Sequence, residues 1–280
     1  MSNSSRLSGG IFLFASLAGI AGPLGAQVLP SLQDSTHRRG KPLFTLDDAL
    51  LGAGFAGLTV AMFPADKAAA RHLRSPSSSQ NRFIANTTTG FETIASPGSL
   101  IIGSGMYVVG KLTHHHELAD VGLHGTESVL VGSTITKIIK DLAGRSRPFV
   151  SDATDPRDWK FGGGFSSDDR QSFPSGHTTA AFAAASAVTS EVKRLYPHMT
   201  WIAGPALYGG ATMVGLSRMY HNKHWASDVA LGAAIGTFSG IKIVRYSHNH
   251  PDNPLDRRML GIIVEPNGEG GELAGVTLAW

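Results

Sequence analysis

The chain has 280 residues, which is enough for one large domain or for one domain with appendages. Only 16% of its residues are charged, against about a quarter in an average soluble domain, whereas 42% are hydrophobic and 34 are glycine. The net charge of +3 includes no Lys- or Arg-rich run, so a nucleic-acid partner has little support, and zero cysteines exclude disulfides, Cys-ligated zinc and thiol catalysis.

The N-terminus has the layout of a secretory signal peptide, residues 1–26. Arg6 precedes an apolar run from Ile11 to Gly22, and small residues follow up to Ala26, where we place the cleavage site. The alternative is an uncleaved N-terminal anchor helix. Either form exports the chain, so we expect a periplasmic or membrane-associated protein with its active site outside the cytoplasm. Residues 27–45 are polar and contain proline, as in a linker.

Six apolar stretches predict an all-α domain over residues 46–245. They cover about 46–63, 97–112, 118–143, 177–195, 200–218 and 225–245. Thr45 is expected to cap the first helix, and Gly144 to end the third. We expect the Ser-, Thr- and Asn-rich segment 75–89 to be a surface loop. The Asp- and Gly-rich loop 149–173 has the length of a functional lid.

Residues 246–280 differ in character and predict a C-terminal extension. Two apolar runs, 259–264 and 272–280, flank an Asn-Gly turn at Asn267-Gly268, which predicts a β-hairpin. The apolar stretches of the helical domain are short for membrane spans, and several carry polar groups. We therefore favour a periplasmic or membrane-associated bundle over a protein that spans the membrane six times.

Three short stretches carry the chemistry. They are Lys140-x6-Arg147-Pro148, Pro174-Ser175-Gly176-His177 and Ser217-Arg218-x5-His224-x3-Asp228. Together they supply three fixed cations, two histidines and a carboxylate, the set that a phosphate ester needs for transfer to a histidine. Each stretch alone is weak evidence, but the three together favour phosphoryl transfer.

His224 and Asp228 form the predicted nucleophile and its orienting group. One turn apart at the start of a helix, the carboxylate can accept a hydrogen bond from one ring nitrogen and leave the other as a lone-pair donor. A helix-capping His–Asp pair is the alternative. His221 is a competing histidine, but it lies further from Asp228 in the sequence. His177 is predicted to protonate the leaving oxygen.

The remaining motif residues predict a phosphate-binding site. Ser175 or a neighbour can cap the following helix, whose first free N–H groups would face an anion, and Gly176 lacks the Cβ that would hinder a phosphate. Lys140, Arg147 and Arg218 supply positive charge. Taken singly, each would be a solvated surface cation or a complement to a helix dipole.

The three stretches resemble the signature of the type 2 phosphatidic acid phosphatase (PAP2) superfamily, which includes lipid phosphatases, bacterial class A acid phosphatases and vanadium-dependent haloperoxidases. The resemblance covers roughly residues 97–245. It implies a six-helix core, a phosphohistidine on His224 assisted by Asp228, and His177 as the acid and base. It also implies a phosphate site without a metal or other cofactor, formed by Lys140, Arg147, Ser175, Gly176 and Arg218.

The predicted function is therefore an exported phosphatase for phosphate monoesters or pyrophosphates, carried by a small molecule or a lipid. The alternatives are a vanadium-dependent haloperoxidase and a catalytically silent phosphate- or lipid-binding membrane protein. His114-His115-His116-Glu117 resembles a metal-binding tract, but we interpret it as a solvated turn, and the aspartates of loop 149–173 as a solvated loop. The sequence sets no oligomeric state.

Overall fold

The computed structural model describes residues 42–73, 82–151, 154–265 and 275–278. The predicted signal peptide and most of the predicted linker, 27–45, therefore lie outside the described residues. From residue 42 onward the described chain belongs to one compact unit, Gly40–Trp280.

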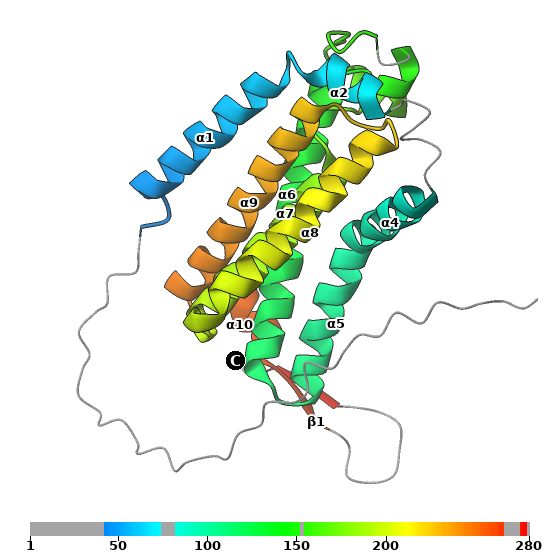
Figure 1. Ribbon diagram of the computed structural model, residues 1–280. Helices are drawn as coiled ribbons and strands as arrows, with labels where there is room; N and C mark the ends of the chain where they lie inside the picture. Colours follow the sequence, from blue (N-terminus) through cyan, green and yellow to red (C-terminus); the bar gives the residue numbers. More distant parts are fainter. Residues whose placement is uncertain (1–41, 74–81, 152–153, 266–274, 279–280) are drawn as a thin grey trace, which may run out of the picture. The chain divides into compact units, whose positions relative to one another are not determined.

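Helices make up most of the described chain (Figure 1). They are α1 (Leu46–Met62), α2 (Asp66–Leu73), α4 (Arg82–Thr93), α5 (Ser99–Leu112), α6 (His116–Ala143), α7 (Gly176–Leu195), α8 (Thr200–Tyr220), α9 (Ala226–Asn249) and α10 (Pro254–Leu260). A π-helical turn, Ile94–Gly98, joins α4 to α5. Each of the six predicted stretches overlaps one of these helices. The described residues also contain α2, α4 and α10, which we did not predict.

Residues 82–89 are not part of the surface loop that the composition of the segment 75–89 predicts, because α4 begins at Arg82, and residues 75–81 lie outside the described residues. This helix packs against α8, and Glu92 of α4 pairs with Arg218 of α8 at 2.6 Å. Ser, Thr and Asn have weak intrinsic helix propensity, and the tertiary contact outweighs it.

The helices that carry the predicted site pack closely through small residues. α7 lies against α6, α8 and α9, and α1 lies along α9 on the outside (Figure 1). The buried residues of α7 and α9 are mainly Ala, Gly, Ser and Thr. A Cβ on Gly236 of α9 would overlap the carbonyl oxygen of Thr179 in α7. Small side chains therefore set the distance between these two helices.

Both predicted helix boundaries are present. Thr45 Oγ1 accepts the Asp48 N–H at 3.3 Å, and Asp48 Oδ2 accepts the Thr45 N–H at 2.8 Å, which makes a capping box. Gly144 ends α6 with a left-handed φ of +60°, and a Cβ there would overlap the Lys160 carbonyl oxygen. The chain therefore turns sharply after α6.

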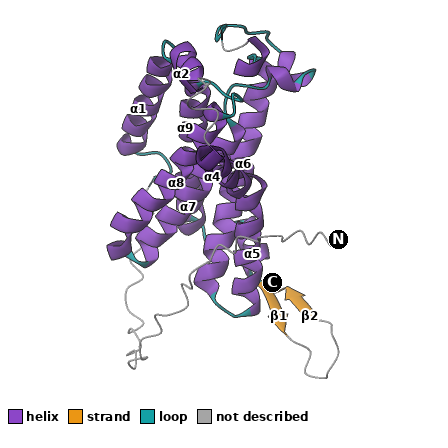
Figure 2. Cartoon of the chain, turned by 45° about the vertical axis from the view of Figure 1, so that its right-hand side comes forward, coloured by secondary structure: helices purple, strands orange, loops and turns teal. Residues whose placement is uncertain are grey.

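The predicted C-terminal extension begins within α9, which continues to Asn249, and α10 follows. Strand β1 (Ile262–Glu265) pairs antiparallel with β2 (Gly275–Leu278), as Figure 2 shows. Residues 266–274, which contain the predicted Asn-Gly turn, lie outside the described residues.

Two helical segments are long and apolar enough to cross a membrane, Thr88–Leu112 and Ala226–Asn249. The bent pair α1 and α2 would make a third if it forms one span. Only 17% of the Thr88–Leu112 window is buried, against 61% of the Ala226–Asn249 window, so the apolar surface of α5 faces outward. Within the described chain, length and composition support fewer than six spans.

Candidate active site

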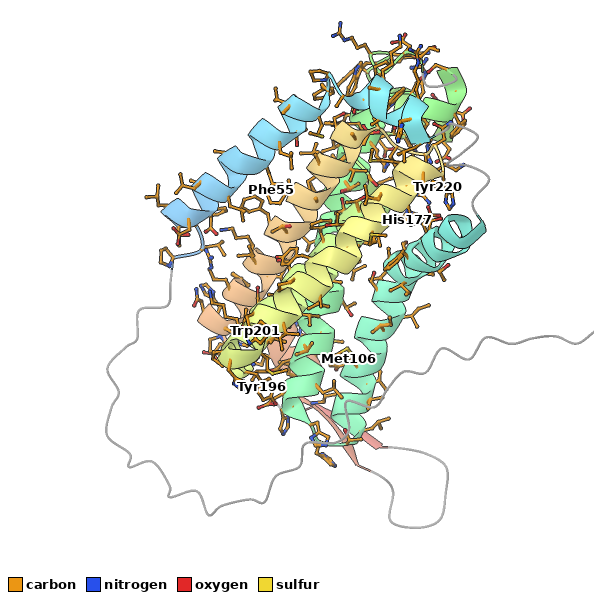
Figure 3. All side chains as sticks on the ribbon, in the orientation of Figure 1. Phe55, Met106, His177, Tyr196, Trp201 and Tyr220 are labelled. Atoms are coloured by element: carbon orange, nitrogen blue, oxygen red, sulfur yellow. The ribbon has the colours of Figure 1, made fainter. Side chains whose placement is uncertain are left out.

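The predicted site residues gather at one end of the bundle. They come from the end of α6 (Lys140), the loop after it (Arg147), the start of α7 (Ser175, Gly176, His177), the end of α8 (Arg218) and the start of α9 (His224, Asp228). In Figure 3, His177 lies at the Tyr220 end of α8, away from Trp201 and Tyr196. Consecutive helices that alternate in direction therefore bring the three motifs together.

His224 is buried, and its Nδ1 donates to the backbone carbonyl oxygen of Ser172 at 2.7 Å. A carbonyl oxygen only accepts, so Nδ1 carries the ring proton and Nε2 carries the lone pair. Nδ1 lies 3.6 Å from Asp228 Oδ2, which is too far for a hydrogen bond. The predicted direct bond between His224 and Asp228 is therefore wrong, because the Ser172 carbonyl takes its place.

Asp228 is fully buried, and both of its oxygens have other partners. Oδ2 accepts the Ser172 hydroxyl at 2.5 Å and the Trp225 N–H at 2.8 Å, while Oδ1 accepts from the Arg145 guanidinium. Asp228 thus holds Ser172, and the Ser172 carbonyl holds His224. The carboxylate positions the histidine through this intermediate residue.

Arg145 has no role in the predicted site, yet it lies buried directly beneath it. Besides Asp228, its guanidinium donates to Asp66 Oδ2 at 2.7 Å and to the Pro156 carbonyl oxygen. Four aromatic rings surround it, those of Phe63, Trp159, Phe173 and Trp225. Arg145 therefore ties α2, the loop after α6 and the start of α9 into one network.

Lys140 and the two arginines are close enough to influence one another electrostatically. Lys140 Nζ donates to the Gln171 carbonyl oxygen at 2.6 Å, and burial together with the Arg147 charge lowers the pKa of Lys140 to about 7. Arg147 pairs with Asp168 at 3.0 Å, and Arg218 pairs with Glu92 at 2.6 Å. A phosphate would compete with these two carboxylates for the guanidinium groups.

Both histidines of the site are neutral near pH 7. Burial, followed by the charge of Lys140, lowers the pKa of His224 to about 3. Burial, followed by the charge of Arg218, lowers the pKa of His177 to about 4. A neutral His224 can act as a nucleophile. A bound phosphate would offset the cations and favour the protonated form of His177.

The start of α7 leaves its first N–H groups open. Ser175 occupies the N-cap position, but its side chain makes no capping bond, because its Oγ accepts the Thr178 hydroxyl at 2.8 Å. A Cβ on Gly176 would lie 3.7 Å from Lys140 Cε, an ordinary contact distance, so packing does not require glycine here. That Cβ would occupy space beside Lys140.

His221, the competing histidine, is occupied on both ring nitrogens. Its Nδ1 lies 2.7 Å from Glu92 Oε1, and its Nε2 lies 3.2 Å from Thr88 Oγ1. No residue in the described part of the chain hydrogen-bonds Nε2 of His224. This contrast favours His224 over His221 as the nucleophile.

The loop 149–173 is tied to the end of α6 rather than standing free. It contains short 3-10 turns, including Gly163–Phe165 and Asp168–Arg170. Asp158 accepts the Ser146 hydroxyl at 2.5 Å and also pairs with Arg170. These ion pairs account for Asp158 and Asp168, so the two carboxylates have partners in the protein.

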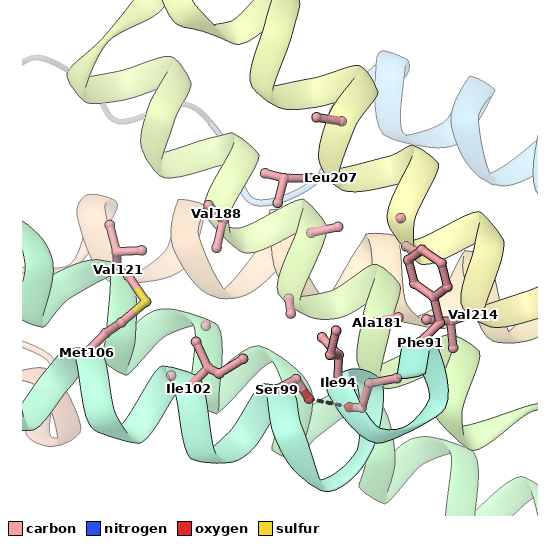
Figure 4. A pocket seen from close by; sticks show the side chains of 18 residues that line it. Phe91, Ile94, Ser99, Ile102, Met106, Val121, Ala181, Val188, Leu207 and Val214 are labelled. Carbon is pink, nitrogen blue, oxygen red and sulfur yellow. Dashed lines mark hydrogen bonds between the residues drawn. The ribbon is translucent and has the colours of Figure 1, made fainter. Parts of the chain in front are cut away.

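Two hollows adjoin the site. A pocket of about 210 Å³ is lined by Lys140, Gly176 and His177, together with residues of α5 and α6. A second cavity, of about 290 Å³, lies between the α4–α5 segment and helices α6, α7 and α8, and its lining is almost wholly apolar (Figure 4). Ala181 and Val214 in this lining are one turn from His177 and Arg218 respectively, so one end of the cavity lies one helical turn from the site.

Residues 123–252 match the family model of the PAP2 superfamily. This part of the chain is a domain of the PAP2 superfamily. Every position of the three motifs named above lies within the matched range. The PAP2 domain thus contains the end of α6, the starts of α7 and α9, and the loop between α6 and α7.

Three known proteins resemble parts of this PAP2 protein. A stretch of 69 residues, 25% of the chain, is 45% identical to a lipid A 1-phosphatase of Porphyromonas gingivalis, but it spans only 15% of that relative's length. The crystal structure of a transmembrane PAP2 type phosphatidylglycerolphosphate phosphatase from Bacillus subtilis has a TM-score of 0.54 and 20% sequence identity to this protein. The match covers 73% of our chain and 97% of the Bacillus chain. The crystal structure of Aquifex aeolicus LpxE has a TM-score of 0.45 and 22% sequence identity. That match covers 63% of our chain and 93% of the LpxE chain. The Bacillus structure shows that the fold is shared.

Proposed function

We propose that this PAP2 protein is a phosphatase that hydrolyses the phosphate of a membrane lipid through a phosphohistidine on His224, without a metal. The observation that carries the proposal is the state of His224. Its ring is neutral, its proton is fixed on Nδ1 by the Ser172 carbonyl, and its Nε2 lone pair has no partner among the described residues. His177 and the cations Lys140 and Arg218 surround the same space.

In the proposed reaction, His224 Nε2 forms a bond to phosphorus while the bond from phosphorus to the leaving oxygen breaks. Protonated His177 gives its proton to that oxygen. Water then attacks the phosphorus and passes a proton to His177, and the N–P bond breaks to release phosphate. Lys140, Arg147 and Arg218, with the open N–H groups at the start of α7, offset the charge on the phosphoryl oxygens.

The apolar cavity beside the site supports a lipid substrate. It offers a place for a hydrocarbon chain whose phosphate lies at His177, because the cavity begins one turn from that residue. Large apolar side chains on the outer helices are also exposed, among them Leu46, Ile101 and Trp201, at 75%, 66% and 75% of their surface. Such surfaces favour contact with a bilayer.

The substrate class is a phosphate or pyrophosphate on a lipid, such as phosphatidic acid, a prenyl pyrophosphate or the 1-phosphate of lipid A. The last of these follows from the name of the Porphyromonas gingivalis relative. The proposed location is the membrane, with the site on its outer, exported side, because the sequence begins with a signal-like segment.

The direct test is phosphate release by purified protein in detergent with excess EDTA. We expect turnover of lipid phosphates, slower turnover of p-nitrophenyl phosphate, and inhibition of both by vanadate. Activity that disappears in EDTA and returns with a divalent metal would contradict the metal-free reaction. Turnover of soluble esters alone would contradict the lipid substrate.

The role of the cavity can be tested with two neighbouring glycines of α8. Gly210 lines the cavity, Gly209 does not, and a Cβ on either meets no atom within 4 Å. Gly210→Leu should lower kcat/KM for a long-chain lipid phosphate and leave p-nitrophenyl phosphate unaffected. Gly209→Leu should affect neither substrate. Equal effects of the two variants on the lipid would argue against this cavity as the chain site.

A further inference from the structure

A polar pocket of about 210 Å³ lies on one side of the proposed phosphate position. Lys140, Gly176 and His177 line it, whereas the two arginines of the site and the proposed nucleophile lie outside its lining. The pocket is therefore on the His177 side of the phosphate. The leaving oxygen must lie on this side if His177 is to protonate it, so the pocket faces the part of the substrate that carries that oxygen.

The polar pocket offers hydroxyl and amide groups. Its polar lining includes Ser96, Ser99, Ser133, Thr136 and Gln171. Gln171 Nε2 donates to the Gly164 carbonyl oxygen at 2.7 Å, which leaves Oε1 as an acceptor. Among the described residues, neither this Oε1 nor the Ser133 hydroxyl has a hydrogen-bond partner. A ligand that carries hydroxyl groups can bond to both, because a hydroxyl donates and accepts.

The charge of the lining disfavours a second phosphate in this pocket. Lys137, the other lysine of the lining, already donates to both oxygens of Asp141, at 2.5 and 2.6 Å. Lys140 serves the first phosphate in the proposed reaction. A pyrophosphate would therefore place its outer charge where the lining has no unpaired cation for it, which is costly. The lining favours an uncharged polar group.

The polar pocket meets the apolar cavity at Ser99. This residue lines both hollows, and Figure 4 shows it in the wall of the cavity. The two linings also adjoin on α7, where Ala180 belongs to the pocket and Ala181 to the cavity. The pocket borders the site through His177, whereas the cavity begins one turn further along α7. A lipid bound in both hollows would thus have a polar part between its phosphate and its hydrocarbon.

We propose that the polar pocket binds an uncharged, hydroxylated linking group, a sugar ring or a glycerol unit, that joins the phosphate of the substrate to its acyl chains. This inference rests on the proposed function, because the phosphate is the one that His224 attacks. The linking group lies beside Ser133 and Gln171, and the hydrocarbon continues past Ser99 into the apolar cavity. When the bond from phosphorus to oxygen breaks, the oxygen of the linking group takes the proton of His177 and leaves as a hydroxyl.

The test compares lipids of equal acyl chains with purified full-length protein in detergent. A diacylated glucosamine phosphate and phosphatidylglycerol phosphate carry free hydroxyls close to the phosphate ester, whereas phosphatidic acid carries none. We expect kcat/KM for at least one of the first two to exceed that for phosphatidic acid about tenfold. The better of the two identifies the linking group as a sugar or as glycerol.

Turnover of phosphatidic acid equal to or faster than that of both hydroxylated lipids would overturn this inference and leave the proposed function standing. Absence of turnover with every lipid phosphate would instead contradict the proposed function, and this inference with it.

Two neighbouring residues of α6 provide matched variants. Ser133 lines the polar pocket, whereas Thr134 is exposed outside the lining and donates its hydroxyl to the Leu130 carbonyl oxygen at 2.8 Å. Ser133→Leu fills part of the pocket and should lower kcat/KM for the preferred hydroxylated lipid about tenfold more than for phosphatidic acid. Thr134→Leu should keep the preference of the parent protein.

If Ser133→Leu does not fold, Ser133→Ala decides the question, because it removes only the hydroxyl. It should raise KM for the hydroxylated lipid about threefold relative to KM for phosphatidic acid. Equal effects of the Ser133 variants on both lipids, or a loss of the preference in Thr134→Leu as well, would place the linking group elsewhere and overturn the inference.

Discussion

The Nδ1 atom of His224 donates to the backbone carbonyl oxygen of Ser172 at 2.7 Å, so a peptide group rather than a carboxylate fixes the tautomer of the proposed nucleophile. A backbone acceptor places no negative charge directly on the imidazole. Burial, followed by the charge of Lys140, keeps the ring neutral with a pKa of about 3, so Nε2 keeps its lone pair over the pH range in which phosphate esters are dianions.

This arrangement predicts different effects for Ser172→Ala and Asp228→Asn. Ser172→Ala keeps the carbonyl that holds His224 and removes one hydroxyl bond to Asp228, so kcat/KM should fall by only about 2- to 10-fold. Asp228→Asn also removes the charge that pairs with Arg145 and should lower kcat/KM at least about tenfold more. Steady-state kinetics on variants with matching circular dichroism would check this order, and a smaller effect of Asp228→Asn would contradict it.

Gly176 offers a test of the phosphate site that does not disturb the fold. Because a Cβ at this position meets the protein only at ordinary contact distance, Gly176→Ala should leave Tm within about 2 °C of the parent protein. It should nevertheless lower kcat/KM and weaken inhibition by inorganic phosphate, since the methyl group occupies space beside Lys140. Unchanged phosphate inhibition in a folded Gly176→Ala protein would place the phosphate elsewhere.

Lys140 should set the alkaline limb of the pH profile. Burial and the Arg147 charge lower the pKa of Lys140 to about 7, so Nζ loses its proton as the pH rises through this value, and kcat/KM should fall above it. A bound phosphate favours the charged amine, so the limb in kcat should lie at higher pH. Lys140→Arg should be slower at its optimum but should lack this limb. An identical limb in that variant would assign it to another group.

Arg145 is predicted to matter for stability. It is fully buried between Asp66 and Asp228, and its removal would leave two buried carboxylates without their cation. Arg145→Met should lower the free energy of unfolding by about 3–5 kcal/mol, measured by denaturant titration in detergent. As a control, Arg157→Met alters an arginine of the exposed loop and should change it by less than about 0.5 kcal/mol. Equal stability of the two variants would contradict the structural role of Arg145.

Much of the site could be predicted from sequence because its chemistry is carried by side chains at fixed spacing. His177, His224 and Lys140 lie where helix ends were expected, since the Gly144 stop and the apolar periodicity fix those ends. The orienting partner of His224 could not be predicted. It is a backbone carbonyl, and because every residue has one, the sequence does not reveal which carbonyl accepts the bond.

The other features that the sequence did not predict, the buried Arg145 and helix α4, depend on tertiary contacts. Arg145 and Arg147 are two residues apart in the same loop, and only the fold distinguishes the buried arginine from the one facing the site. Helix α4 forms in a segment with weak helix propensity because Glu92 pairs with Arg218, a residue distant in sequence. Such long-range contacts cannot be read from local composition.

The central claim is a covalent phosphate on His224, and chemical quench of the His177→Ala protein in EDTA tests it most directly. With p-nitrophenyl phosphate, whose leaving group needs little protonation, this variant should form the phosphoenzyme but hydrolyse it slowly, because no imidazole activates the water. We predict an acid-labile, base-stable phosphate that mass spectrometry locates on His224 and that is missing from the His177→Ala/His224→Ala double variant. A phosphoenzyme that persists in the double variant, or turnover in His224→Ala equal to that of the parent protein, would contradict the account.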